Sequence, residues 1–208
     1  ILKSKTIITN ASGVHSGPVS EFAMGMILYL SKRFGGCESF KNDAVWTQWK
    51  LARKTIQLNG KTVGIIGFGN IGKAIAKKAK AFDMKVIATR RLQKKVENKK
   101  IVDELIPLSD LDYLLAKSDY VVIACPLTPL TQGMIGSKEL AKIKSSAFII
   151  NIARGKIIDE TALIESLQNK RIAGAGLDVF STEPLDKHSP LFGLDNVFLS
   201  PHISGNFP

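Results

Sequence analysis

The chain has 208 residues, of which 45% are hydrophobic, and a formal net charge of +11. This apolar content can fill a core and argues against disorder, whereas the longest apolar run, at 22–30, is far shorter than the roughly 20 residues needed to cross a bilayer. The two cysteines, Cys37 and Cys125, lie too far apart in sequence to suggest a disulfide framework or a zinc motif, so we expect a cytoplasmic protein without a metal site or a membrane anchor.

Hydrophobic spacing predicts one helix early in the chain. Residues 19–33 have the apolar spacing of a helix, and Gly35-Gly36 is expected to end it. Residues 41–54 are polar apart from Trp46 and Trp49. These two side chains belong either to the core or, if they are exposed, to a contact with a partner subunit.

A regular alternation of strands and helices follows residue 61. The expected strands are 62–67, 85–89, 119–125, 147–152, 172–179 and 197–200, with a further apolar segment at 101–105. The expected helices are 70–82, 109–117, 137–142 and 159–168. Ser109 and Asp112 suggest a capping box for the second of these helices. Strands that are continuous apolar runs between helices predict an α/β fold with a doubly wound parallel sheet covered on both faces.

The first strand of this alternation ends in a glycine-rich turn, Gly67-x-Gly69-x-x-Gly72, which leads directly into a helix. Gly67 permits the turn, Gly69 lets a pyrophosphate approach the backbone, and Gly72 lets the helix pack closely on the strand. The phosphates would face free N–H groups at the helix N-terminus. The strand–turn–helix context therefore predicts a dinucleotide site, with a glycine-rich turn of an unrelated α/β protein as the alternative.

The positive charge is concentrated just after this turn. Residues 73–100 hold eleven Lys and Arg against two acidic residues, a local net charge of +9. Arg90 and Arg91 follow the second strand, where an enzyme that uses NAD places an acidic residue, so NADP is favoured over NAD. The alternatives are a solvated basic face with NAD bound indifferently, and a nucleic-acid surface, which the lack of interleaved aromatic residues disfavours.

Later motifs occur in an order that resembles the D-isomer-specific 2-hydroxyacid dehydrogenases, in particular their glyoxylate/hydroxypyruvate reductase-like members. Besides the glycine turn, they are Pro126-Leu127-Thr128-Pro129-x-Thr131, Asn151-x-Ala153-Arg154-Gly155 with Asp159-Glu160 behind it, Gly176-Leu177-Asp178-Val179-Phe180-x-x-Glu183-Pro184 and Ser200-Pro201-His202-Ile203-Ser204-Gly205. Each is weak alone, but the set is specific and covers the chain from about residue 10 onward. The resemblance implies a Rossmann cofactor domain, with the substrate domain largely absent from this chain.

The resemblance also implies roles that the chemistry supports. His202 would be the general acid toward the carbonyl oxygen, because a histidine side chain titrates near neutral pH. Glu183 would orient and stabilise that ring, and Arg154 would bind the substrate carboxylate with its planar fork of donors. The residues expected to line the cofactor are Gly67, Gly69, Asn70, Ile71, Gly72, Arg90, Arg91, Cys125, Pro126, Ile152, Asp178, His202 and Gly205. Asp178 would lie near the nicotinamide, whereas His15 and His188 would be surface or hinge residues.

These observations predict a division into residues 1–15, a hinge and remnant of a substrate domain; 16–200, the dinucleotide-binding domain with a dimerisation arm at about 34–58; and 201–208, a hinge that carries the histidine. The expected function is NAD(P)H-dependent reduction of a small 2-keto acid such as glyoxylate or hydroxypyruvate, or oxidation of a D-2-hydroxy acid such as glycerate. A homodimer through the cofactor domain is expected. The competing hypotheses are a dinucleotide-sensing, corepressor-like interaction protein on the same scaffold, and a nucleic-acid binder.

Overall fold

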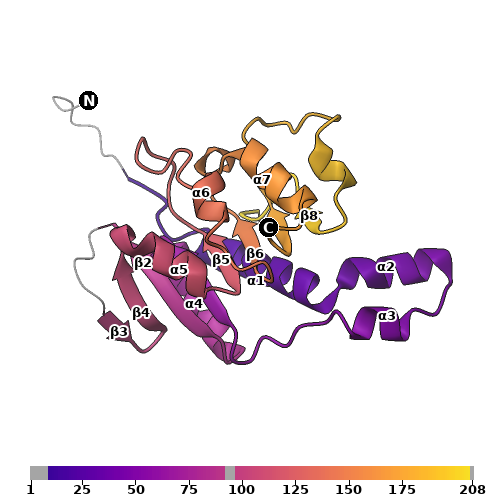
Figure 1. The fold of residues 1–208 in the computed structure, drawn as a ribbon. Coiled ribbons are helices and arrows are strands. Elements are labelled where there is room, and N and C mark those ends of the chain that lie inside the picture. Colours follow the sequence, from indigo (N-terminus) through magenta and orange to yellow (C-terminus); the bar gives the residue numbers. More distant parts are fainter. Residues whose placement is uncertain (1–8, 92–96, 207–208) are drawn as a thin grey trace.

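The computed structural model describes residues 9–91 and 97–206 and contains one sheet of eight strands in these ranges (Figure 1). The strand order is β3-β4-β2-β1-β5-β6-β7-β8, and all neighbouring strands are parallel except β3 and β4. The strands are β1 Thr62–Ile66, β2 Lys85–Arg90, β3 Glu97–Lys99, β4 Val102–Pro107, β5 Tyr120–Ile123, β6 Phe148–Asn151, β7 Gly174–Leu177 and β8 Val197–Leu199.

Helices connect these strands and form a separate arm. The α-helices are α1 Ser16–Lys32, α2 Phe34–Asp43, α3 Gln48–Ala52, α4 Asn70–Ala81, α5 Leu111–Lys117, α6 Ser137–Leu140 and α7 Glu160–Gln168. Three short 3₁₀ helices add η1 Leu108–Asp110, η2 Gly155–Ile157 and η3 Pro190–Gly193. No helix in the described ranges is both long and apolar enough to span a membrane.

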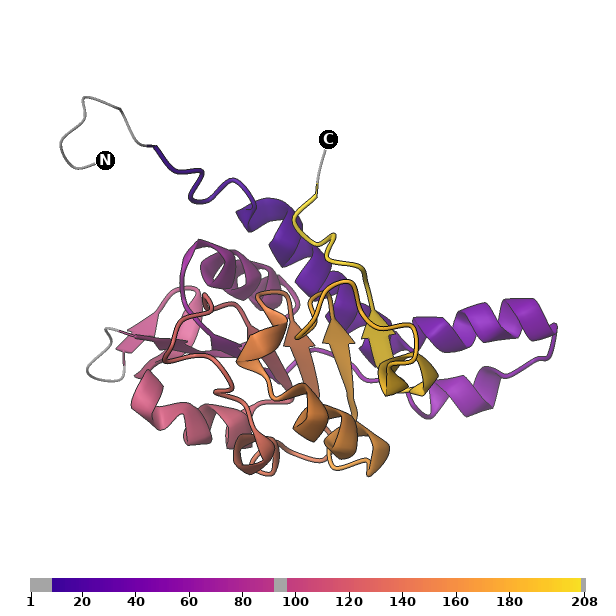
Figure 2. The same cartoon turned by 90° about the horizontal axis from the view of Figure 1, so that it is seen from above.

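The sheet is covered on both faces, which is why its central strands are largely apolar (Figure 2). Alternate residues of one strand enter different cores: Ile65 of β1 packs with α1 and α4, whereas Ile66 packs with α5, α6 and α7. The chain leaves β1 in one direction toward β2 and β4 and later returns to add β5 on its other side. The switch point between β1 and β5 is where a doubly wound sheet opens a ligand crevice. The predicted fold is thus confirmed.

Two local expectations were wrong. Gly35 and Gly36 do not end the first helix but lie inside α2, because Arg33 takes a left-handed conformation (φ 58°) and ends α1 itself. The Arg33 side chain is held there by a hydrogen bond from its Nε to the Lys54 carbonyl and by its position over the Phe148 ring. The Ser109–Asp112 capping box is absent, because η1 precedes α5 and the Ser109 hydroxyl donates to Asp110 instead.

The arm formed by α2 and α3 projects away from the sheet (Figures 1 and 2). Neither helix has a buried residue. Trp46 and Trp49 are 77% and 68% exposed, which excludes the core as their place in this chain. Phe40 packs edge-on against Trp46, with the ring centroids 5.7 Å apart. The arm therefore presents an aromatic surface.

Candidate functional site

The glycine turn lies at the switch point and is shaped by the neighbouring strands. Gly67 has φ +106°, and a Cβ there would lie 2.7 Å from the Cys125 backbone nitrogen. The Gly67 and Phe68 N–H groups donate to the Thr89 carbonyl at the end of β2, which fixes the turn to the sheet. A Cβ at Gly72 would overlap the Gly67 carbonyl, so α4 packs directly on the turn. The sequence reading of these two glycines matches the geometry.

Gly69 differs from these two glycines, because a Cβ at this position would meet no protein atom within 4 Å. It is the N-cap of α4, whose first turn contains no acidic residue and whose cap receives no side-chain hydrogen bond. The helix therefore presents uncapped N–H groups to an open space, which suits an anionic group. The residues at the turn fit a dinucleotide pyrophosphate.

A cleft of about 380 Å³ runs from this turn along the carboxyl ends of β1, β2 and β5. Lys73, Arg90 and Arg91 all line it, and no acidic residue is among the described residues that do. The expected Arg90 and Arg91 thus share the cleft with Lys73, a third cation that sequence reasoning missed. Its signal was available, since Lys73 directly follows Gly72 and is the first residue of the basic stretch 73–100. The cleft favours a ligand that carries several negative charges.

An adjoining cleft of about 410 Å³ lies between the ends of β5 and β6. Its walls hold Ile71, Cys125, Pro126, Ile152 and Arg154, all of which the sequence predicted at the cofactor or substrate. Burial raises the pKa of the Cys125 thiol to about 11, so this group is neutral near pH 7. Cys125 therefore contributes a small uncharged surface rather than a reactive thiolate.

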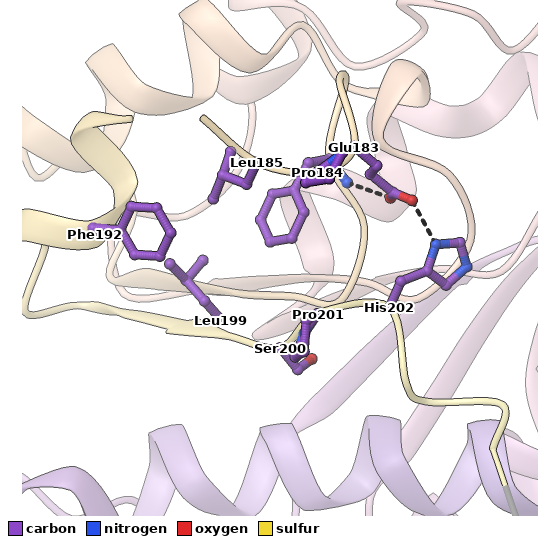
Figure 3. Close-up of a pocket in the computed structure, with 9 residues that line it drawn as sticks. Glu183, Pro184, Leu185, Phe192, Leu199, Ser200, Pro201 and His202 are labelled. Carbon is purple, nitrogen blue, oxygen red and sulfur yellow. Dashed lines mark hydrogen bonds and ion pairs between the residues drawn. The ribbon is translucent and has the colours of Figure 1, made fainter. Parts of the chain in front are cut away.

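His202 and Glu183 form the predicted pair (Figure 3). The imidazole Nδ1 lies 2.7 Å from Glu183 Oε2, and Glu183 Oε1 accepts from the Phe180 N–H at 3.0 Å. Partial burial raises the pKa of the Glu183 carboxyl, but the hydrogen bonds from His202 and Phe180 and the charges of His202 and Arg154 outweigh it and hold this pKa below its ordinary value. Because the carboxylate engages Nδ1, Nε2 is the nitrogen left to exchange a proton with a ligand.

A tight loop after β6 places Arg154 at the same edge of the sheet as Glu183 and His202. Asn151 holds this loop, with its Oδ1 accepting from Ala153 N–H and its Nδ2 donating to the Arg154 carbonyl. Gly155 then packs against the backbone of residues 180 and 181 so closely that a Cβ would overlap it. This contact explains why the exposed Arg154 is near enough to Glu183 to lower its pKa. The three predicted catalytic residues are therefore neighbours.

Asp178 and Gly205, both expected at the cofactor, have other partners in the structure. Asp178 is fully buried, and its two carboxylate oxygens accept from the Ser200 hydroxyl at 2.7 Å and from the N–H groups of Ile203 and Ser204 at 2.9 Å each. The Gly205 carbonyl accepts from the His15 ring. Sequence reasoning missed these contacts, because no short-range pattern links residues so far apart. Asp178 thus holds the loop that carries His202.

Beside the pair lies an apolar pocket of about 710 Å³ (Figure 3). It is lined mainly by Phe180, Pro184, Leu185, Phe192, Leu199 and Pro201, with Glu183 and His202 at one edge. Phe192 of η3 is 60% exposed. Nothing in the sequence distinguished this pocket from the rest of the core.

The chain is similar in sequence to known proteins. A family model described as "D-isomer specific 2-hydroxyacid dehydrogenase, NAD binding domain" matches residues 24–204. Over 201 residues the chain is 41% identical to a glyoxylate reductase from Thermococcus gammatolerans, a match that covers 94% of this chain and 59% of that relative. The chain thus spans about three fifths of the length of the curated relatives it matches.

Solved structures of similar proteins superpose well on this chain. A D-isomer specific 2-hydroxyacid dehydrogenase from Xanthobacter autotrophicus, in complex with NADPH and MES, superposes with a TM-score of 0.85 at 30% identity and covers 99% of this chain and 82% of that one. An NADPH-dependent glyoxylate/hydroxypyruvate reductase from Sinorhizobium meliloti superposes with a TM-score of 0.83 at 28% identity, covering 96% of this chain and 98% of that one.

Proposed function

Because the chain belongs to the D-isomer specific 2-hydroxyacid dehydrogenase family, we propose that the protein reduces a small 2-keto acid to the D-2-hydroxy acid with a reduced nicotinamide dinucleotide. The observation that carries the proposal is the His202–Glu183 hydrogen bond beside Arg154, at the same sheet edge as the glycine turn. A dinucleotide sensor would need the turn alone. This constellation therefore favours the enzyme over the sensor.

The proton is supplied by His202. A bound nicotinamide dinucleotide would supply the hydride for C2 of the keto acid. The protonated His202 donates from Nε2 to the carbonyl oxygen, which becomes the hydroxyl, and the ring is left neutral. Glu183 keeps its charge throughout, holds Nδ1 and stabilises the imidazolium before the transfer. In the oxidative direction the neutral ring accepts the same proton.

Arg154 binds the substrate. Its exposed guanidinium donates to the Ala153 carbonyl through one nitrogen, which leaves other donors of the fork for a carboxylate. A permanent positive charge close to the reacting carbonyl also stabilises the negative charge that develops on oxygen. The preferred substrates are small 2-keto acids, glyoxylate and hydroxypyruvate among them, with glycerate as a substrate of the reverse reaction.

The cofactor is NADP rather than NAD. Lys73, Arg90 and Arg91 line one cleft without an acidic counterpart among its described residues, and an extra phosphate on the adenosine ribose would find three cations there. The pyrophosphate would bind at Gly69, Asn70 and Ile71. An acidic residue in place of Arg90 would instead favour the free ribose hydroxyl of NAD.

The protein is further proposed to be a cytoplasmic homodimer. The α2–α3 arm exposes Trp46 and Trp49, and large exposed aromatic residues are favourable anchors of subunit interfaces. Both cysteines are free thiols in the described structure, as is usual in a reducing compartment.

The test is an assay of the complete protein that carries this chain. Consumption of NADPH and of NADH is followed with glyoxylate, hydroxypyruvate and larger 2-keto acids. We expect turnover of the small acids, with a higher kcat/KM for NADPH. Dinucleotide binding without turnover of any 2-keto acid would favour the sensor instead.

A further inference from the structure

The loop that carries His202 is held from two sides. On the sheet side, buried Asp178 accepts from Ile203 and Ser204 N–H. On the opposite side, His15 Nδ1 lies 2.9 Å from the Gly205 carbonyl oxygen, although 190 residues separate the two in sequence. His15 is the N-cap of α1, a helix of 17 residues whose buried side chains fix it to the sheet. The ring therefore connects the loop to a rigid element.

We propose that His15 is a positioning residue for His202 and acts through its hydrogen bond to the Gly205 carbonyl. The effect on turnover rests on the proposed function, in which His202 is the proton donor. The effect on loop geometry is independent of the proposed function.

The chemistry of the bond defines which atom donates. A carbonyl oxygen only accepts, so the proton lies on His15 Nδ1 whether the ring is neutral or charged. The contact is also close, since a Cβ at Gly205 would lie 3.4 Å from Nδ1 and 3.7 Å from Val19 Cγ2. The turn at residues 203–206, closed by the Asn206 N–H to Ile203 carbonyl bond, thus lies directly on the first turn of α1.

The backbone conformation of His202 explains why the loop needs support from His15. Its φ is 55°, a left-handed conformation that a residue with a Cβ rarely adopts unless its surroundings impose it. On the N-terminal side, Ser200 holds it through its carbonyl, which accepts from His202 N–H at 3.0 Å. On the C-terminal side, the turn depends on Asp178 and His15. Without the His15 bond, the turn can shift, and His202 can relax away from Glu183.

The experiment compares two replacements in the complete protein that carries this chain. In His15→Asn the amide nitrogen occupies the position of Nδ1 and can donate to Gly205. In His15→Leu the volume is kept but the donor is lost. His188→Leu serves as a control, because His188 is exposed and its backbone N–H, not its ring, donates to Asp186. If His15→Leu does not fold, His15→Ala removes the donor without a branched side chain and takes its place.

Two readouts are recorded for each variant. One is the pH midpoint of the Glu183 carboxyl, measured by carbon NMR; the other is kcat with glyoxylate, alongside the dissociation constant of NADPH. In His15→Leu we expect the midpoint to rise toward an ordinary carboxyl value and kcat to fall about tenfold, while the NADPH dissociation constant changes by less than about twofold. His15→Asn and His188→Leu should match the unaltered protein.

The outcomes separate the two proposals. An unchanged Glu183 midpoint in His15→Leu overturns the positioning role, as does a His15→Asn variant that behaves like His15→Leu. If no protein in the series turns over a 2-keto acid but the midpoint rises only in His15→Leu, the positioning role stands and the proposed function fails. If the unaltered protein is active and the midpoint rises while kcat does not fall, His15 positions the loop but not the proton donor, and the proposal is overturned.

Discussion

Glu183 Oε2 and His202 Nδ1 lie 2.7 Å apart although 19 residues separate them in sequence. The pair forms because β7 and β8 are neighbours in the sheet and the loops after them turn toward each other. Neither side chain is deeply buried, with 36% of Glu183 and 46% of His202 exposed, so solvent has access to the pair. The bond therefore acts mainly on orientation and charge rather than on stability.

The pair makes part of the stability depend on pH. Because the pKa of Glu183 is lowered in the folded protein, ionised Glu183 contributes stability above the ordinary carboxyl pKa, and this contribution is lost as the pH falls through the lowered value. We expect Glu183→Gln to be less stable than the unaltered protein at pH 6, with the difference closing in strongly acidic solution. Urea unfolding from pH 6 to pH 2 measures it. A difference that grows on acidification would contradict the assigned direction of the pKa shift.

His202→Ala removes the proposed proton donor. We expect kcat for reduction of a 2-keto acid to fall by about 10² to 10⁴, the usual contribution of general acid catalysis. NADPH affinity should change little, because His202 borders the apolar pocket beside the pair and does not line the basic cleft. Stopped-flow turnover and a fluorescence titration with NADPH measure the two quantities, and His188→Ala is the control. Turnover within about twofold of the unaltered protein would exclude the assigned role.

Arg90→Asp tests the cofactor preference. The acid would repel the extra phosphate of NADP and accept from the ribose hydroxyl of NAD. A hydrogen bond to a charged group contributes about 1.5–3 kcal/mol, so we expect the ratio of kcat/KM for NADPH over NADH to fall by about tenfold to a hundredfold. Arg171→Asp changes the net charge equally at an exposed position and should leave the ratio unchanged. An unaltered ratio in Arg90→Asp would refute the assignment of the phosphate to this cleft.

Much of the candidate site could be predicted because its residues lie in short motifs or directly after strands. The turn from Gly67 to Gly72 belongs to one short glycine motif, although the backbone at Cys125 and Thr89 also shapes it. Strands β1, β5 and β6 are largely apolar because helices cover both faces. The candidate catalytic residues follow the ends of strands, which parallel pairing places at one edge. Motif order and strand alternation were therefore sufficient for the fold and for which residues gather at this edge, while the roles of these residues stay predictions.

Other features depend on contacts that no local pattern encodes. The left-handed Arg33 that separates α1 from α2 is stabilised by Lys54 and Phe148, which lie elsewhere in the chain. The antiparallel strand β3 is only three residues long, below what alternation can detect. The bond from His15 to Gly205 joins the two ends of the described chain. Each depends on packing or length that the sequence pattern does not reveal.

Cys125 should be an unreactive thiol. With its pKa at about 11, about one molecule in a thousand carries a thiolate at pH 8. We expect iodoacetamide to label exposed Cys37 well before Cys125, and the rate at Cys125 to rise about tenfold per pH unit between pH 8 and pH 10. Mass spectrometry of the digested protein resolves the two sites, and Cys37→Ser provides the matched control. NADPH should slow the reaction further, because Cys125 lines both clefts. Equal rates at the two cysteines would contradict the raised pKa.

The aromatic arm gives the test of subunit association. Trp46 and Trp49 are more exposed than large aromatic side chains usually are on the surface of a monomer. A tryptophan at the centre of an interface contributes about 2 kcal/mol or more to binding. Trp49→Ala should therefore weaken a homodimer at least about thirtyfold. Analytical ultracentrifugation across a range of concentrations measures the shift. Tyr113→Ala, at an exposed position of α5, which lies on the opposite side of the molecule from the arm, controls for loss of an aromatic surface. A dimer that dissociates equally in both variants would place the interface elsewhere, and a monomer in the unaltered protein would show that the arm serves another contact.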